Sequence, residues 1–117
     1  MNLSITLAAL VAVIFIPLGA AKILAVPPMR ARAAHAGFSV AAYRRIGVLE
    51  VAGAIGVLIG LIIPPLGGLA GAGLLLLLAG AIVTHVRHHD AARELAPAVV
   101  SAALVAGYLA VLAGAAS

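Results

Sequence analysis

Apolar residues occupy four long stretches of this chain, and short polar or proline-rich segments separate them. Each stretch approaches the roughly 20 residues that a helix needs to cross a bilayer. The pattern predicts an all-α fold, an integral membrane four-helix bundle that forms a single transmembrane domain over residues 1–117. The expected helices cover about residues 3–26, 40–63, 66–86 and 96–115.

Prolines and one serine set the expected helix ends. Pro27-Pro28 ends the first helix, because proline lacks an amide proton and its ring clashes with the preceding turn. The segment Ile63-Pro64-Pro65-Leu66 predicts a tight turn that makes the second and third helices a hairpin. Ser39 is a suitable N-cap for a helix that begins near Val40, before the apolar part of the second helix.

The loop after the first helix contains a candidate interfacial helix at residues 29–37. Such a helix lies in the membrane surface, with its apolar side toward the acyl chains and its polar side toward the headgroups. We expect Met29 to face lipid, and Arg30, Arg32 and His35 to face phosphates.

Basic residues predict the orientation of the helices, because loops that carry Lys and Arg stay in the cytoplasm. The turn between the second and third helices contains none of them, and neither do the segments beyond the first and last helices. Both termini are therefore expected outside, with the two longer loops in the cytoplasm. The residues that flank those loops are Lys22, Arg30, Arg32, Arg44, Arg45, Arg87 and Arg93.

Composition supports a membrane location and excludes several classes of function. Hydrophobic residues make up 66% of the chain and charged residues only 9%, whereas globular proteins have about 25% charged residues. The absence of cysteine excludes disulfides, a thiol relay, covalently attached c-type haem and Cys-ligated metal centres. The net charge of +4 does not indicate nucleic-acid binding, because aromatic residues are 3% and no binding motif is present.

Small residues on three helices provide faces for close packing. One of these faces can serve a homodimer equally well as the bundle itself, and the sequence leaves both options open. The small residues recur every fourth position at Gly56 and Gly60, at Gly67 and Gly71, and at Ala102, Ala106, Ala110 and Gly114.

Two ionisable residues lie inside or at the border of the apolar stretches. Lys22 precedes Pro27 by five residues, and Glu50 follows Arg45 by five residues. Because the first two helices run in opposite directions, Lys22 and Glu50 lie at similar depths near the cytoplasmic side. A charge at mid-bilayer costs roughly 2.5–3.5 kcal/mol, and opposite charges about 4 Å apart gain about 4 kcal/mol at an effective dielectric of 20. An ion pair is one interpretation, and snorkelling of Lys22 to the interface is the alternative.

Other polar residues are expected in the same leaflet. Arg44 and Arg45 compete with Lys22 as partners for Glu50, and Tyr43 shares the helix face of Glu50. Thr84, His85 and Ser101 lie near the inner ends of the third and fourth helices. Together these side chains predict a small inward-facing pocket for a ligand or an ion pair. The predicted pocket residues are Lys22, Glu50, Tyr43, Arg44, His85 and Ser101.

The segment "HVRHHD" at residues 85–90 suggests a metal site, since His85 and His89 are four residues apart and Asp90 is adjacent. A complete site needs further ligands, and these residues also match an ordinary basic border at a membrane surface. We therefore predict no metal site. No nucleophile with a base, phosphate loop or carboxylate dyad occurs, so we predict no catalytic residues.

Two motifs resemble those of the DoxX-like family of small four-helix membrane proteins. They are "GAAKILAVPPM" at the end of the first helix and "YRRIGVLEVAGAIGVLIG" at the start of the second, in which Lys22, Gly47 and Glu50 carry the likeness. The resemblance implies a bacterial inner-membrane protein in which Lys22 and Glu50 occupy the polar positions of the family. It also implies association with membrane redox complexes, because the family is named after a subunit linked with quinol and thiosulfate oxidation.

These observations favour a non-enzymatic accessory subunit or binding module. Its pocket around Lys22 and Glu50 is expected to hold a membrane partner or a small amphipathic ligand such as a quinone. One alternative is a subunit of a quinone-linked oxidoreductase, in which Glu50 or His85 passes protons and a partner carries the electrons. A small dimeric transporter is a further alternative, although the polar residues lie in one leaflet only.

Overall fold

The computed structural model describes residues 2–116, with side chains described for residues 2–114. All regular structure in this part of the chain is helical, as the sequence predicted. Four long helices are present, and a fifth, short helix lies where the sequence analysis placed a candidate interfacial helix. They are α1 Leu3–Ile23, α2 Pro27–Ala36, α3 Val40–Ile59, α4 Pro64–Arg87 and α5 Ala92–Ala116.

Three of the helices are long and apolar enough to cross a membrane, namely α1, α4 and the part of α5 from Ala92 to Gly114. α3 is not among them. Its twenty residues include Arg44, Arg45 and Glu50, so no long window of α3 is free of several charges. The chain is a membrane protein by length and composition of these three helices.

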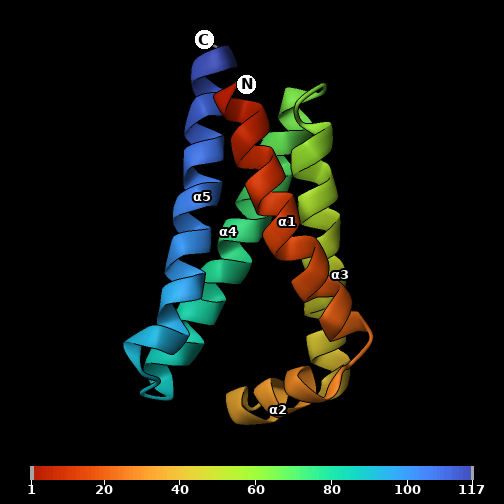
Figure 1. The fold of residues 1–117 in the computed structure, drawn as a ribbon, viewed down its shortest axis with the longest axis vertical. Coiled ribbons are helices and arrows are strands. Elements are labelled where there is room, and N and C mark those ends of the chain that lie inside the picture. Colours follow the sequence, from red (N-terminus) through yellow and green to blue (C-terminus); the bar gives the residue numbers. More distant parts are fainter. Residues whose placement is uncertain (1, 117) are drawn as a thin grey trace.

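The four long helices surround a common core (Figure 1). α1 packs against α3 and α5, and α4 packs against the same two helices. Both ends of the chain and the α3–α4 turn lie at one end of the molecule, and α2 lies across the other end beside the α4–α5 turn. The longest dimension is 43 Å, close to the roughly 40–45 Å of a bilayer with its headgroups.

The junction between α1 and α2 follows from Pro27 and Pro28. These residues occupy the first positions of α2, where a missing amide proton leaves no helical hydrogen bond unmade. α1 therefore ends at Ile23, three residues before the expected end. The intervening turn places Ala25 at φ 51°, the left-handed region that few non-glycine residues adopt.

A capping serine and a proline also mark the ends of α3 and the start of α4. The Ser39 hydroxyl accepts a hydrogen bond from the Ala42 amide at 3.0 Å, which confirms Ser39 as the N-cap of α3. α3 ends at Ile59 and not at residue 63. Pro64 begins α4 and disfavours the helical conformation at Ile63, which is the N-cap of α4. The turn between them is thus residues 60–63.

Apolar side chains face both the core and the outside. The core contains Val11, Val57, Leu74, Val105 and Tyr108, each no more than 1% exposed. In the three candidate spans only 17–22% of the apolar windows is buried within the protein. The exposed apolar surface, with side chains such as Leu69 and Leu76 about three-quarters exposed, requires lipid around it.

Glycines set the closest helix approaches. A Cβ atom on Gly47 of α3 would lie 2.6 Å from the Gly19 carbonyl oxygen of α1, and a Cβ on Gly19 would lie 2.7 Å from the Gly47 carbonyl oxygen. No Cβ fits at such distances. α1 and α3 can therefore cross this closely only because both positions are glycine.

The predicted small-residue faces of α3 and α4 are used inside the chain. A Cβ on Gly56 would lie 2.6 Å from the Ala70 Cβ, and one on Gly60 would lie 2.4 Å from the Gly67 Cα. The Tyr108 hydroxyl donates a hydrogen bond to the Val57 carbonyl at 2.9 Å beside Gly60 and Gly67. These contacts join α3, α4 and α5 at the end of the molecule away from α2.

A methyl group at the α1–α3 crossing should separate these helices. Gly47→Ala is expected to lower the free energy of unfolding by about 1–3 kcal/mol, the usual range for overpacking. The measurement is denaturant unfolding in detergent, followed by helical circular dichroism. Gly73→Ala is the matched control, since a Cβ there meets nothing within 4 Å. Equal stability of the two variants would refute the close crossing.

Candidate functional site

Lys22 and Glu50 form an ion pair where α1 and α3 cross. Lys22 lies in the last turn of α1, and Glu50 lies in the middle of α3. The Lys22 ammonium donates a hydrogen bond to the Glu50 carboxylate. The side chains are 14% and 5% exposed, respectively, so both charges are largely removed from solvent.

The glycine crossing positions this pair. Gly19 precedes Lys22 by three residues, and Gly47 precedes Glu50 by three residues, so each glycine lies one turn from its charged neighbour. A Cβ on Gly47 would also lie 2.8 Å from the Lys22 Cβ. The close backbones thus bring the two side chains within reach of each other.

Tyr43 lies beside the ion pair. The Lys22 ammonium nitrogen is 5.0 Å from the centroid of the Tyr43 ring, within the range of a cation–π interaction. Phe38 stacks on Tyr43, with 6.3 Å between the ring centroids. The Tyr43 ring thus covers one side of the Lys22 ammonium group.

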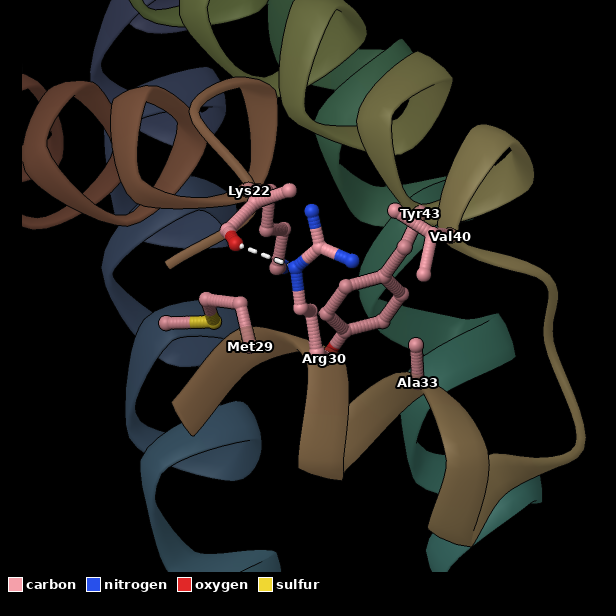
Figure 2. Close-up of a pocket in the computed structure, with 7 residues that line it drawn as sticks. Lys22, Met29, Arg30, Ala33, Val40 and Tyr43 are labelled. Carbon is pink, nitrogen blue, oxygen red and sulfur yellow. Dashed lines mark hydrogen bonds between the residues drawn. The ribbon is translucent and has the colours of Figure 1, made fainter. Parts of the chain in front are cut away.

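The end of α1, α2 and the start of α3 form a corner around Lys22, and α2 closes it from below (Figure 2). The gap is lined by Lys22, Met29, Arg30 and Tyr43, with three small or branched residues around them, Ala25, Ala33 and Val40. The Arg30 side chain extends into this gap, and its Nε donates a hydrogen bond to the Ala25 carbonyl at 2.8 Å. The side chains leave no volume for a water molecule between them. The corner is therefore closed in this conformation.

Met29 does not face lipid as the sequence analysis expected. It is 6% exposed and lines the gap beside Arg30. Met29 and Ala33 lie on the side of α2 that packs against the bundle. They do so because the turn at Ala25 directs α2 back under α1 and α3. Arg30, Arg32 and His35 are exposed, as expected for groups at a headgroup surface.

The remaining predicted site residues lie in other surroundings. Arg44 donates from Nε to the Ile23 carbonyl at 2.8 Å, so it caps the end of α1. His85, at the end of α4, hydrogen-bonds to Asp90. Ser101 is buried on α5. The structure thus brings Lys22, Glu50 and Tyr43 together, and neither His85 nor Ser101 lines the gap.

A second polar cluster joins α2 to the α4–α5 turn. The Asp90 carboxylate accepts hydrogen bonds from His85 Nδ1 at 2.7 Å and from His35 Nε2 at 2.8 Å. The His35 ring also packs against the His88 ring, with 5.4 Å between centroids. The hydrogen bonds from His85 and His35 hold the pKa of Asp90 below its ordinary value.

Sequence reasoning missed two contacts of these clusters. Arg30 was assigned to the headgroups alone, and its place beside Lys22 depends on the turn at Ala25. His35 and Asp90 are 55 residues apart, so no local spacing indicates their contact. Within the described residues, no three side chains of the His, Cys, Asp or Glu type are grouped so as to hold a metal ion.

The apolar helices and the buried ion pair define a helical membrane protein with a polar corner at one end. The model of the DoxX-like family matches residues 6–115, nearly the whole chain, and the protein belongs to this family. This confirms the resemblance found in the sequence. No curated protein and no solved structure matches the chain significantly.

Removal of either charge should destabilise the corner through the partner left behind. Lys22→Met and Glu50→Gln are each expected to lower the free energy of unfolding by about 3 kcal/mol, because a buried charge then lacks compensation. The double variant should lose clearly less than the sum of the two single losses. Denaturant unfolding in detergent measures all three. Strict additivity would contradict a direct interaction.

The Asp90 cluster, which holds α2 against the α4–α5 turn, should make the stability of the folded protein dependent on pH. A lowered pKa means that the carboxylate stabilises the folded state above its ordinary pKa, and that this contribution disappears as the pH falls through the lowered value. As the pH falls from above the ordinary pKa of an Asp carboxyl through the lowered value, the wild type should therefore lose the stability advantage that it has over Asp90→Asn. Thermal unfolding in detergent at a series of pH values measures the difference. A constant difference across this range would refute the contribution of Asp90.

Proposed function

We propose that this protein is a non-enzymatic accessory subunit or binding module, in which the corner around Lys22, Glu50 and Tyr43 recognises a small amphipathic molecule such as a quinone. The observation that carries the proposal is the ion pair buried in an otherwise apolar bundle. Buried charges in membrane helices are expensive and mostly serve a function. The association with membrane redox complexes that the family resemblance implies supports the same ligand class.

The donors at the corner suit the acceptor oxygens of a quinone. Lys22, Arg30 and Tyr43 all line or border the gap and all carry N–H or O–H groups. A quinone headgroup presents carbonyl oxygens that accept hydrogen bonds, and its isoprenoid tail would lie along the exposed apolar helices. Because the gap is closed, binding requires the Arg30 side chain or α2 to move aside.

α2 is suited to such movement. It is ten residues long and has only two buried side chains, Met29 and Ala33. Its polar attachments are the Arg30 bond to Ala25 and the His35 bond to Asp90, and His35 is 60% exposed. Few buried contacts favour local opening at low free energy.

The proposed setting is a bacterial inner membrane, with α3 as a fourth spanning helix. In this arrangement both termini are outside, and α2 and the α4–α5 turn face the cytoplasm, in line with the basic residues at that end. The single transmembrane domain comprises residues 1–117. A homodimer is proposed through the small residues of α5, of which Ala106 and Ala110 are exposed.

Measurement of bound quinone tests the proposal. Wild-type protein, the double variant Lys22→Met/Glu50→Gln and the control Ser101→Ala are purified from native membrane, and quinone per protein is determined by mass spectrometry. The double variant removes both charges and avoids an unpaired one, so it should remain folded. We expect it to retain about tenfold less quinone than the other two proteins, the effect of roughly 1.4 kcal/mol of lost binding.

Two results would overturn the proposal. Equal quinone content in all three proteins would show that the corner does not hold the ligand. Turnover of a quinone by the purified wild-type protein alone would show that the protein is an enzyme.

A further inference from the structure

The net charge of the protein is concentrated at the α1–α2–α3 corner. Residues 22–50 contain five basic residues and one acidic residue, which gives +4, the formal net charge of the entire chain. Arg87 and Arg93 at the α4–α5 turn are balanced by Asp90 and Glu94. The two corners at the same end of the molecule thus differ by four charges.

All three carboxylates of the chain are already engaged. Glu50 pairs with Lys22, Asp90 accepts from His85 and His35, and Glu94 accepts from Arg93 Nε at 3.2 Å. Among the residues that the structure describes, no carboxylate pairs with the arginines of α2 and of the first turns of α3. They are Arg30, Arg32, Arg44 and Arg45, and all four are exposed.

The bonds that these arginines make leave most of their donors available. Arg30 uses Nε for the Ala25 carbonyl, and Arg44 uses Nε for the Ile23 carbonyl. Arg32 contacts the Met29 sulfur at 3.9 Å through one terminal nitrogen. A guanidinium held through Nε still presents its two terminal nitrogens, the pair that binds phosphate oxygens in a bidentate manner.

We infer that this corner is a binding site for the phosphate headgroup of an anionic phospholipid, centred on Arg30 and Arg32. Charge complementarity identifies a phosphate, and the neighbouring surface identifies a lipid as its source. Leu24 is 73% exposed and Phe38 is 40% exposed, on either side of α2 in the chain. These apolar side chains offer contacts for acyl chains, which inorganic phosphate lacks.

The site requires that the protein lies in a membrane. It shares Arg30 with the gap of the proposed quinone site, whereas Arg32 does not line that gap. The lipid phosphate contacts the exposed arginines, whereas the ion pair lies behind them. Basic clusters next to membrane helices bind anionic headgroups in this way, and each Lys or Arg near the surface contributes measurably. The variant Lys22→Met/Glu50→Gln keeps both arginines, so a loss of quinone from that variant leaves the lipid site testable.

Lipid titration with native mass spectrometry tests this site. The detergent-solubilised protein is titrated with phosphatidylglycerol, with phosphatidylcholine of the same acyl chains, or with inorganic phosphate, and the dissociation constant of the first bound molecule is measured. Phosphatidylglycerol should bind at least tenfold more tightly than phosphatidylcholine. Arg30→Gln/Arg32→Gln should weaken phosphatidylglycerol binding by about fivefold per arginine.

Arg87→Gln/Arg93→Gln is the matched control, because it removes the same charge at the same end of the molecule. It should leave phosphatidylglycerol binding within about twofold of the wild type. Arg30→Lys/Arg32→Lys keeps the charge but loses the paired terminal nitrogens, so its affinity should lie between those of the wild type and the Gln variant. Circular dichroism verifies the fold of each variant.

Three results would overturn the inference. They are equal affinity for the two lipids, an equal loss from both pairs of glutamine substitutions, and binding of inorganic phosphate as tight as that of phosphatidylglycerol. The last result would identify a free-anion site. A high salt concentration supplies a check on the wild type alone, since it should weaken the binding of phosphatidylglycerol more than that of phosphatidylcholine.

Discussion

The ion pair between Lys22 and Glu50 constrains the rest of the structure. Two charges that are 14% and 5% exposed must lie next to each other, because each alone would be poorly solvated among apolar helices. Their contact fixes both the depth and the rotation of α1 against α3. The close crossing at Gly19 and Gly47 makes this contact possible, since a larger residue at either position would move the two charges apart.

The position of α2 is a consequence of this constraint. α1 must end soon after Lys22 for the chain to turn back, and Pro27 and Pro28 then begin a helix that runs under α1 and α3. At its far end His35 reaches Asp90, which lies after α4. α2 therefore links the α1–α3 pair to the α4–α5 pair at one end of the bundle (Figure 1). Its link to the α4–α5 pair is polar, and only two of its side chains, Met29 and Ala33, are buried.

The sequence predicted the features that depend on local chemistry and on depth. The helical class and the N-cap at Ser39 follow from apolar length and a capping hydroxyl. Two antiparallel helices predicted similar depths for Lys22 and Glu50 but left their ion pair as one of several alternatives, and the structure shows that pair. It did not predict that Met29 turns inward, because this depends on the left-handed conformation of Ala25. Contacts between distant residues, such as His35 with Asp90, depend on how the helices pack, and the spacing of residues along the sequence does not indicate them.

The placement of charge explains why the polar corner lies at one end of the bundle. Near a membrane surface Lys22 has two ways to lower its energy, the contact with Glu50 and the extension of its stem toward water. Glu50 has a shorter side chain and depends on its partner. Four exposed arginines around the same corner add a positive potential that attracts anions from the membrane surface. The buried pair and the exposed arginines thus lie at the same end of the bundle, and the arginines determine which charged groups its surface can bind.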